Sequence, residues 1–195
     1  MGSLMTICKK RNIKIVEDAA GALGTYYLKG KFKNKHAGTV SDVGCLSFNG
    51  NKIITSGGGG MILTNDKKLA QKAKYLSTQA MDDPIRYIHN DIGYNYRLTN
   101  IQAAIGLAQL EKIKFFLKRK NIIYNFYKKA FKKIIGINFV KKPDYAKNNK
   151  WMLSIELDEK KHKLKKNALI KFLFENRIET RSTWLPIHRQ RKYLN

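Results

Sequence analysis

The sequence has few cysteines, few acids and no long hydrophobic run. Two cysteines, Cys8 and Cys45, occur in 195 residues. This is too few for the disulfide framework of a small secreted domain, so we expect a reducing, cytoplasmic location. No stretch of about 18 apolar residues is present, which predicts no membrane-spanning helix. No apolar segment follows the N-terminal charges as it would in a secretory signal peptide.

The shortage of acids leaves a formal net charge of +25, from 39 Lys+Arg against 14 Asp+Glu. Such a charge favours nucleic acid or another anionic partner. Lysines outnumber arginines 31 to 8 and are scattered, however, and AT-rich codons encode the abundant Lys, Ile and Asn alike. The densest basic stretch, residues 112–133, fits a helix that binds phosphates or the solvated face of an amphipathic helix. Without a helix-turn-helix, zinc or RNA-binding signature, nucleic-acid binding remains a remote alternative, and we expect neither nucleic acid nor membrane as a partner.

A hydrophobic content of 43% is enough for a folded core. The apolar residues 13–16 predict a short buried strand that ends in Glu17 and Asp18. Residues 43–48 and 60–66 predict two more strands, and residues 66–78 predict a helix. Carboxylates at strand ends fit a parallel sheet, where binding sites gather at the carboxyl ends of the strands.

The second half of the chain has a different texture. Residues 80–97 show neither the helical nor the strand spacing of hydrophobic residues, and they predict a long functional loop. Thr99 and Gln102 predict a capping box that begins a helix extending as far as residue 133. A strand over 151–158, a helix over 165–175 and a strand passing into a loop over 177–188 follow. This order predicts an α/β domain and then a smaller α+β unit.

Three residues, taken together with the glycine run 57–60, suggest a cofactor-binding site. A lysine such as Lys52, held near other cations, can form a Schiff base. The hydroxyl of Ser47 can donate to a phosphate, and Asp18 can pair with a protonated ring nitrogen, which together is how proteins hold pyridoxal phosphate. Taken alone, Asp18 also fits a helix cap or a turn residue, Lys52 a surface lysine, and the glycine run a plain tight turn. No Walker or GxGxxG motif is present.

Residues 16–66 and 77–113, which include VEDAAGALG, SFNGNKIITSGGGG and GYNYRLTN, closely resemble the DegT/DnrJ/StrS family of pyridoxal-phosphate-dependent nucleotide-sugar aminotransferases. The resemblance implies an α/β fold of the aspartate-aminotransferase type (fold type I), incomplete in this chain. Residues 1–119 would be the C-terminal portion of the large cofactor-binding domain, and residues 120–195 a partial small α+β domain. The motifs are most similar to the branch that makes UDP-4-amino-4,6-dideoxy-N-acetylglucosamine for bacillosamine and legionaminic acid.

The resemblance also implies residue roles. Lys52 matches the Schiff-base lysine, which also shuttles a proton. Asp18 matches the acid on the pyridinium nitrogen, and Ser47 a hydroxyl that binds the cofactor phosphate. Asn95 matches an asparagine that reaches the cofactor of the neighbouring subunit, so the site would be shared across a homodimer. Three further polar residues are candidates for substrate contact, with turn or surface roles as the alternative: Asn49, Arg181 and His188. No metal site is predicted.

The implied activity transfers an amino group from L-glutamate to carbon 4 of a UDP-linked 4-keto-6-deoxy-N-acetylhexosamine, for surface-glycan synthesis. Perosamine-type substrates are chemically close. A lysine at position 52 argues against the related dehydratases, which have histidine there.

The sequence departs from the family pattern in two ways. Gly21 stands where the family usually has Gln, His or Glu near the cofactor ring. The chain also has about half the usual length, and it lacks the "SGT" turn that binds the phosphate, the aromatic that stacks on the ring and the last small-domain elements. A truncated, catalytically inactive member of the family is therefore the alternative.

Overall fold

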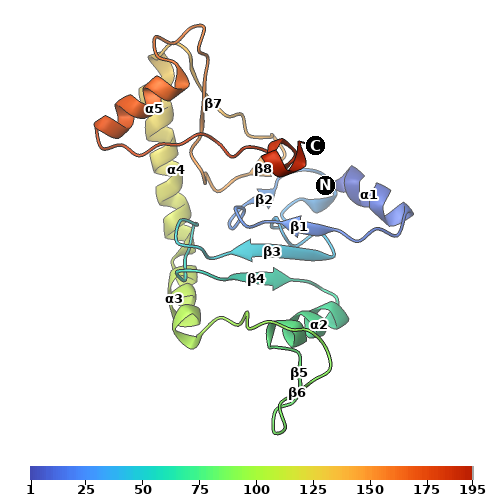
Figure 1. Ribbon diagram of the computed structural model, residues 1–195. Helices are drawn as coiled ribbons and strands as arrows, with labels where there is room; N and C mark the ends of the chain where they lie inside the picture. The colour runs from blue at the N-terminus through green and yellow to red at the C-terminus, as the bar shows by residue number, and fades with distance from the viewer. Residues whose placement is uncertain (195) are drawn as a thin grey trace. The chain divides into compact units, whose positions relative to one another are not determined.

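The computed structural model describes residues 1–194 and forms two compact units. Unit 1 contains Met1–Tyr124 and Lys142–Trp151, and unit 2 contains Asn125–Lys141 and Met152–Asn195. The chain passes from unit 1 to unit 2 within a long helix, α4 (Ile113–Ala130), drawn in yellow in Figure 1.

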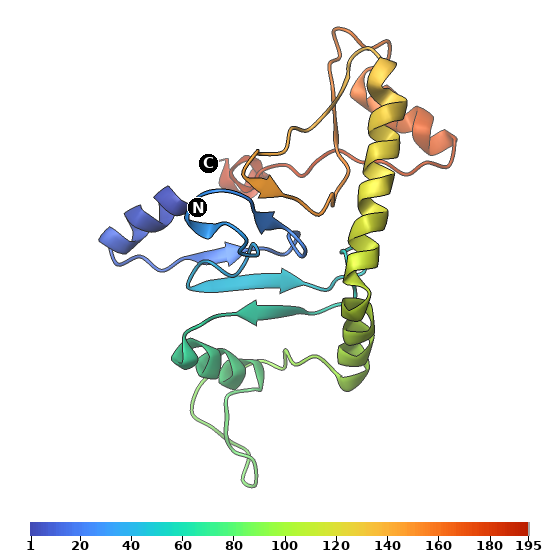
Figure 2. The ribbon, with the colours of Figure 1, turned by 180° about the vertical axis from the view of Figure 1, so that it is seen from behind.

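A three-stranded sheet organises unit 1, in the order β1 (Val16–Asp18), β3 (Val43–Ser47) and β4 (Gly60–Leu63). β1 and β3 run parallel, with Asp18 opposite Cys45, whereas β4 runs antiparallel to β3. The carboxyl ends of β1 and β3 therefore share one edge of the sheet, as predicted. Figures 1 and 2 both show α3 (Asn100–Glu111) and the start of α4 across this end of β3.

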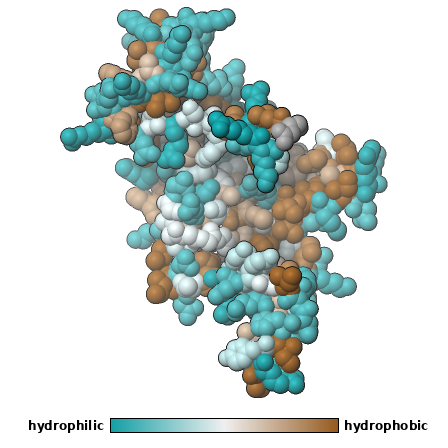
Figure 3. Space-filling view, viewed as in Figure 1, coloured by the Kyte–Doolittle hydropathy of each residue, from teal (hydrophilic) through white to brown (hydrophobic). Residues whose placement is uncertain are grey.

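The prediction of a buried apolar strand over residues 13–16 is wrong. Ile13 is 52% exposed and Val16 67% exposed, and Figure 3 shows hydrophobic atoms at the surface around this sheet. The buried residue of β1 is Glu17, because its side chain alternates to the inner face of the strand. Its carboxylate accepts hydrogen bonds from the hydroxyls of Tyr27 and Ser41, both at 3.3 Å.

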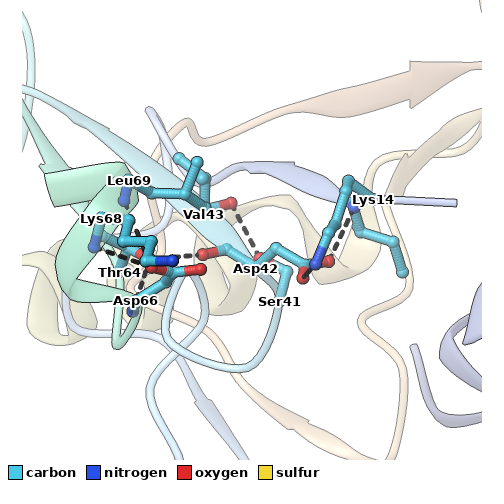
Figure 4. Close-up of polar contacts among 9 residues, drawn as sticks. Lys14, Ser41, Asp42, Val43, Thr64, Asp66, Lys68 and Leu69 are labelled. Atoms are coloured by element: carbon cyan, nitrogen blue, oxygen red, sulfur yellow. Dashed lines mark hydrogen bonds and ion pairs between the residues drawn. The ribbon is translucent and has the colours of Figure 1, made fainter. Parts of the chain in front are cut away.

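Asp42 ties the beginnings of β1 and β3 together (Figure 4). Its Oδ2 accepts the Ile15 amide at 2.9 Å, and its Oδ1 pairs with Lys14 Nζ at 3.2 Å. The Ile15 amide first, and then Lys14, lower the pKa of Asp42. The Asp42 carbonyl also accepts the Thr64 hydroxyl at 2.7 Å, which links the end of β4 to the same point.

The first two predicted helices begin where the sequence predicted them. α2 (Lys67–Ser77) is capped by Asp66, whose Oδ1 accepts the amides of Lys68 and Leu69 at 2.8 and 3.2 Å (Figure 4). α3 begins with the capping box of Thr99 and Gln102.

The helix predicted to continue from there to residue 133 is divided. Lys112 has ψ 9°, outside the α-helical range, so α3 ends and α4 begins on either side of it. A 3₁₀ turn, η2 (Phe131–Lys133), follows α4.

The segment 80–97, predicted as an irregular loop, contains a small antiparallel hairpin of β5 (Met81–Asp83) and β6 (Ile88–His89). Asp83 fixes its turn, because its carboxylate accepts the amides of Ile85 and Arg86 at 2.9 Å. Unit 1 also contains elements that the sequence did not predict: helix α1 (Gly2–Lys10), the antiparallel pair β2 (Tyr26–Tyr27) and β8 (Ala146–Lys147), and η1 (Gly30–Phe32).

The core of unit 1 gathers where the loop after β3 meets the first turns of α4. Phe48, Ile53 and Ile54 are its buried members. Partly buried hydrophobic residues pack around them: Leu23, Leu46, Leu98, Ile113, Phe116, Leu117 and Trp151. This core lies directly beside the predicted site.

Unit 2 consists of the antiparallel pair β7 (Ile137–Phe139) and β9 (Ile155–Leu157), helix α5 (Lys166–Glu175), η3 (Ile187–Arg189) and η4 (Arg191–Tyr193). α5 is predicted correctly, whereas the strand predicted over 151–158 is limited to β9. The strand predicted within 177–188 does not form, because this described segment has no neighbouring strand to pair with. No helix within residues 1–194 is both long and apolar enough to cross a membrane.

Candidate active site

Lys52 lies in the loop that joins β3 to β4. Phe48 closes the base of this loop, since its amide donates to the Gly59 carbonyl at 3.0 Å. The Phe48 carbonyl accepts the Ser56 amide and the Thr55 hydroxyl, both at 3.0 Å. The loop is therefore held at its base by main-chain hydrogen bonds.

The turn that carries Lys52 is fixed on both sides. The Lys52 amide donates to the Asn49 carbonyl at 3.0 Å, and the Asn49 amide lies 3.4 Å from Ser47 Oγ. Ile53 and Ile54 follow immediately and are 7% and 2% exposed. Two consecutive buried side chains thus anchor the loop directly after the lysine.

The glycine run shapes the return of the loop into β4. Gly57 and Gly59 have φ of 80° and 82°, a region that favours glycine. A Cβ on Gly59 would also lie 2.7 Å from Leu98 Cδ2. The run is therefore the special backbone passage that the sequence predicted.

The side chain of Lys52 is half-buried against Trp151. Its Nζ lies 4.2 Å from the centre of the indole ring, which is a cation–π distance. The indole Nε1 donates to the Asn51 carbonyl at 2.6 Å. The sequence did not point to Trp151, because it lies about 100 residues further along the chain and has no motif of its own.

Asp18 and Ser47 end the parallel strands at one edge of the sheet. Asp18 is exposed, and its Oδ1 accepts the Ala20 amide at 3.0 Å. Within residues 1–194, no cation forms an ion pair with it, so the carboxylate is available to a charged ring nitrogen. A carboxylate, a hydroxyl and a lysine around one edge fit the donor set that pyridoxal phosphate needs.

Of the remaining candidates, Asn49 lies in the same turn and contacts both Ser47 and Lys52 through its backbone. Asn95 is exposed and forms a β-bridge with Thr78, and Asn49 is exposed in the turn before Lys52. Arg181 and His188 belong to unit 2, where Arg181 Nη2 pairs with Glu179 Oε1 at 2.8 Å. The substrate contacts of these residues remain predictions.

Unit 1 has a cavity of about 790 Å³ beside the glycine run. Gly59, Tyr96, Arg97 and Gln102 are among its lining residues. Arg97 is thus a candidate that the sequence analysis did not name, although it stands in the same GYNYR segment as Asn95. Its position two residues after Asn95 was the available signal.

No group of three or more His, Cys, Asp or Glu side chains that could hold a metal ion occurs among the described residues. The candidate site consists of Lys52 and its indole neighbour, together with Asp18 and Ser47 at the ends of β1 and β3.

The model of the DegT/DnrJ/EryC1/StrS aminotransferase family matches residues 1–195. The chain belongs to this family. Its members are sugar aminotransferases that depend on pyridoxal phosphate, as the motifs around Lys52 predicted.

Two enzymes of known activity are similar to the chain. GDP-perosamine synthase of Escherichia coli O157:H7 is 38% identical over 195 residues, which is 99% of this chain and 50% of the enzyme. A UDP-4-amino-4,6-dideoxy-N-acetyl-beta-L-altrosamine transaminase of Campylobacter jejuni is 33% identical over 80% of this chain and 41% of the enzyme. The chain spans about half the length of the curated relatives that it matches.

The solved structure of Helicobacter pylori PseC, an aminotransferase of pseudaminic acid biosynthesis, aligns with a TM-score of 0.85 at 27% identity. The alignment covers 98% of this chain and 51% of PseC. The predicted family and the predicted incomplete fold type I are confirmed.

Proposed function

We propose that this chain takes part in the transfer of an amino group to a nucleotide-linked keto sugar, with Lys52 as the catalytic residue. The supporting observation is the position of Lys52 on an anchored loop, next to the carboxyl ends of β1 and β3. Residues 1–119 would supply part of the cofactor-binding domain and residues 120–195 part of the small domain.

Each residue of the edge has a distinct task in this proposal. Lys52 would hold the cofactor covalently and would carry a proton between the cofactor carbon and carbon 4 of the sugar. Asp18 keeps the cofactor ring nitrogen protonated through its negative charge, and Ser47 donates to the phosphate. When bound, pyridoxal phosphate supplies an electron sink that stabilises negative charge on the carbon next to the transferred nitrogen.

The substrate that we propose is a UDP-linked 4-keto-6-deoxy-N-acetylhexosamine, with L-glutamate as the amino donor and a surface glycan as the destination. Relatives that act on GDP-perosamine and on a UDP-linked amino sugar are both similar to the chain. An assay with the UDP-linked and GDP-linked keto sugars side by side tests the nucleotide. Preference for the GDP-linked sugar would overturn that part of the proposal.

Asn49, Arg181 and His188 are the proposed substrate contacts, and the cytoplasm is the proposed location.

The decisive experiment is cofactor trapping. The protein mixed with pyridoxal phosphate should develop the absorbance band of a lysine Schiff base, and borohydride should then fix the label on Lys52. Peptide mass spectrometry locates the label, which matters because 31 lysines compete for the reagent. The band and the label at position 52 should disappear in Lys52→Ala and persist in Lys67→Ala, an exposed control.

Label spread evenly over surface lysines, unchanged by Lys52→Ala, would contradict the proposal. Cofactor binding at Lys52 without turnover on either keto sugar would instead identify an inactive member of the family.

We also propose a homodimer in which Asn95 completes the site of the partner subunit. Subunit mixing tests this arrangement. Lys52→Ala and Asn95→Ala proteins should each bind the cofactor poorly, and a mixture should recover binding, because each hybrid dimer has one site with both native residues. No recovery from well-folded mixed subunits would exclude a shared site.

A further inference from the structure

Trp151 contacts the turn of Lys52 at two points, through its ring to Lys52 and through its nitrogen to Asn51. The face of the indole lies 4.2 Å from Lys52 Nζ, and the indole Nε1 donates at 2.6 Å to the carbonyl of Asn51, the preceding residue. A lysine side chain on a surface loop ordinarily samples many rotamers. Here one aromatic residue holds both the backbone of the turn and the charged end of the side chain.

Trp151 is itself held by a buried residue. Its amide donates to Asn149 Oδ1 at 2.9 Å. Asn149 is 4% exposed, and its Nδ2 donates to the carbonyls of Gly21 and Leu23 at 2.8 and 2.9 Å. The tryptophan is therefore fixed to the segment after β1, the strand that ends in Asp18.

Gly21 leaves the space that the indole occupies. A Cβ at this position would lie 2.8 Å from Trp151 Cζ3 and 3.2 Å from Cε3. Because real Cβ atoms do not approach ring carbons this closely, any side chain at position 21 would push the indole away from its place. The small residue at 21 and the large residue at 151 are thus complementary.

We propose that Trp151 is a positioning residue for Lys52, and that the indole can take this place only because position 21 is glycine. The indole face holds the ammonium group in one place by a cation–π contact, beside the edge where Asp18 and Ser47 end. The inference deepens the proposed function, since it gives Trp151 a role only through Lys52.

A measurement without cofactor tests the contact. Reductive methylation with ¹³C-formaldehyde labels the lysines and preserves their charge, and absence from the spectrum of Lys52→Arg assigns the Lys52 resonance. The indole ring current should move this resonance upfield of the common lysine signals. Trp151→Leu should return it to them, Gly21→Ala should move it most of the way back, and Trp151→Phe should keep part of the shift.

A second aromatic contact provides the matched control. Lys72 Nζ lies 5.1 Å from the ring of Tyr75 in unit 1. Tyr75→Leu should move the Lys72 resonance and leave that of Lys52 unchanged. A Lys52 resonance among the common signals in the native protein, or one that Trp151→Leu and Gly21→Ala do not move, would overturn the proposal.

Cofactor trapping then links the contact to the proposed function. Trp151→Leu and Gly21→Ala should slow Schiff-base formation at Lys52 several-fold, and Trp151→Phe should restore most of the rate. Equal rates in all variants would refute a positioning role. If native Lys52 shows the upfield resonance and yet never reacts with the cofactor, the proposed function fails and the indole contact stands.

Discussion

At the residue scale, the two adjacent acids of β1 have opposite environments. Glu17 is 8% exposed, whereas Asp18 is exposed at the end of the strand. The Glu17 carboxylate accepts hydrogen bonds from two hydroxyls, and one of these belongs to Tyr27. Burial first, and then the charge of Glu17, raise the pKa of Tyr27 to about 12.

This raised pKa predicts an alkaline loss of stability. Folded Tyr27 keeps its proton up to about pH 12, whereas the unfolded chain releases it near pH 10. The unfolded state therefore binds fewer protons in this interval, so the contribution of Tyr27 is complete below pH 10 and disappears as the pH rises through 12. In an alkaline titration followed by tyrosinate absorbance, one phase should appear near pH 12. Tyr27→Phe should remove this phase, and Glu17→Gln should shift it partly toward pH 10. A phase that Glu17→Gln leaves in place would contradict this.

Asn149 is a buried polar residue on which three backbone groups of unit 1 depend. Asn149→Ala leaves the carbonyls of Gly21 and Leu23 and the amide of Trp151 without their partner. Buried polar groups without partners destabilise a protein, and we expect a loss of about 3 kcal/mol in the free energy of unfolding. Denaturant unfolding measures it. Asn148→Ala, at the exposed neighbouring position, should change stability by less than about 0.5 kcal/mol, and equal effects would contradict the assignment.

At this scale, sequence reasoning can name candidates only where a local motif displays them. Lys52, Asp18 and Ser47 were predicted because each stands at a strand end or turn within a motif that resembles the family, and their roles stay predictions. Trp151 and Asn149 were not predicted, because their contacts with residues 21–52 are formed only after the chain has folded back over more than 90 residues.

At the scale of the element, the glycine run gives a sharp comparison between neighbours. Gly59 has φ of 82°, and a Cβ there would lie 2.7 Å from Leu98 Cδ2. Gly59→Ala should therefore lower the free energy of unfolding by at least about 1 kcal/mol. Gly58 has no positive φ, and a Cβ there would meet its nearest neighbour, Gln102 Nε2, at 3.9 Å. Gly58→Ala should be neutral, and thermal unfolding of both variants measures the difference. A larger loss of stability in Gly58→Ala than in Gly59→Ala would show that the loop has another conformation.

Elements that carry their own end signals were predictable. α2 and α3 begin at side-chain caps that the sequence displays, Asp66 and Thr99. The hairpin of β5 and β6 was missed because its strands are too short to show a period of two. β1 was placed correctly but its faces were not, because the exposure of Val16 depends on what lies beside the strand.

At the scale of the whole molecule, the accessible surface is unusually large. It amounts to 15752 Å². Two separate compact globules with the sizes of the two units would expose about 11,000 Å². The excess of about 4,700 Å² exceeds the roughly 1,600 Å² that a standard protein interface buries in total. Much of it is hydrophobic, including Val16 on β1 and Ile62 on β4.

This surface predicts that the isolated chain associates. Exposed apolar strands attract further protein surface, and open sheet edges offer unpaired hydrogen-bonding groups. Sedimentation velocity over a concentration series should show species heavier than the 22.5 kDa monomer, and the chain should bind the dye ANS.

A combined Val16→Lys and Ile62→Lys variant should shift the distribution toward monomer, because it places charge on the exposed face of the sheet. Ile135→Lys, an equally drastic change at a residue of unit 2 that is 73% exposed, should have a smaller effect. A native chain that stays monomeric at every concentration and binds no dye would show that the exposed strands of unit 1 do not drive association.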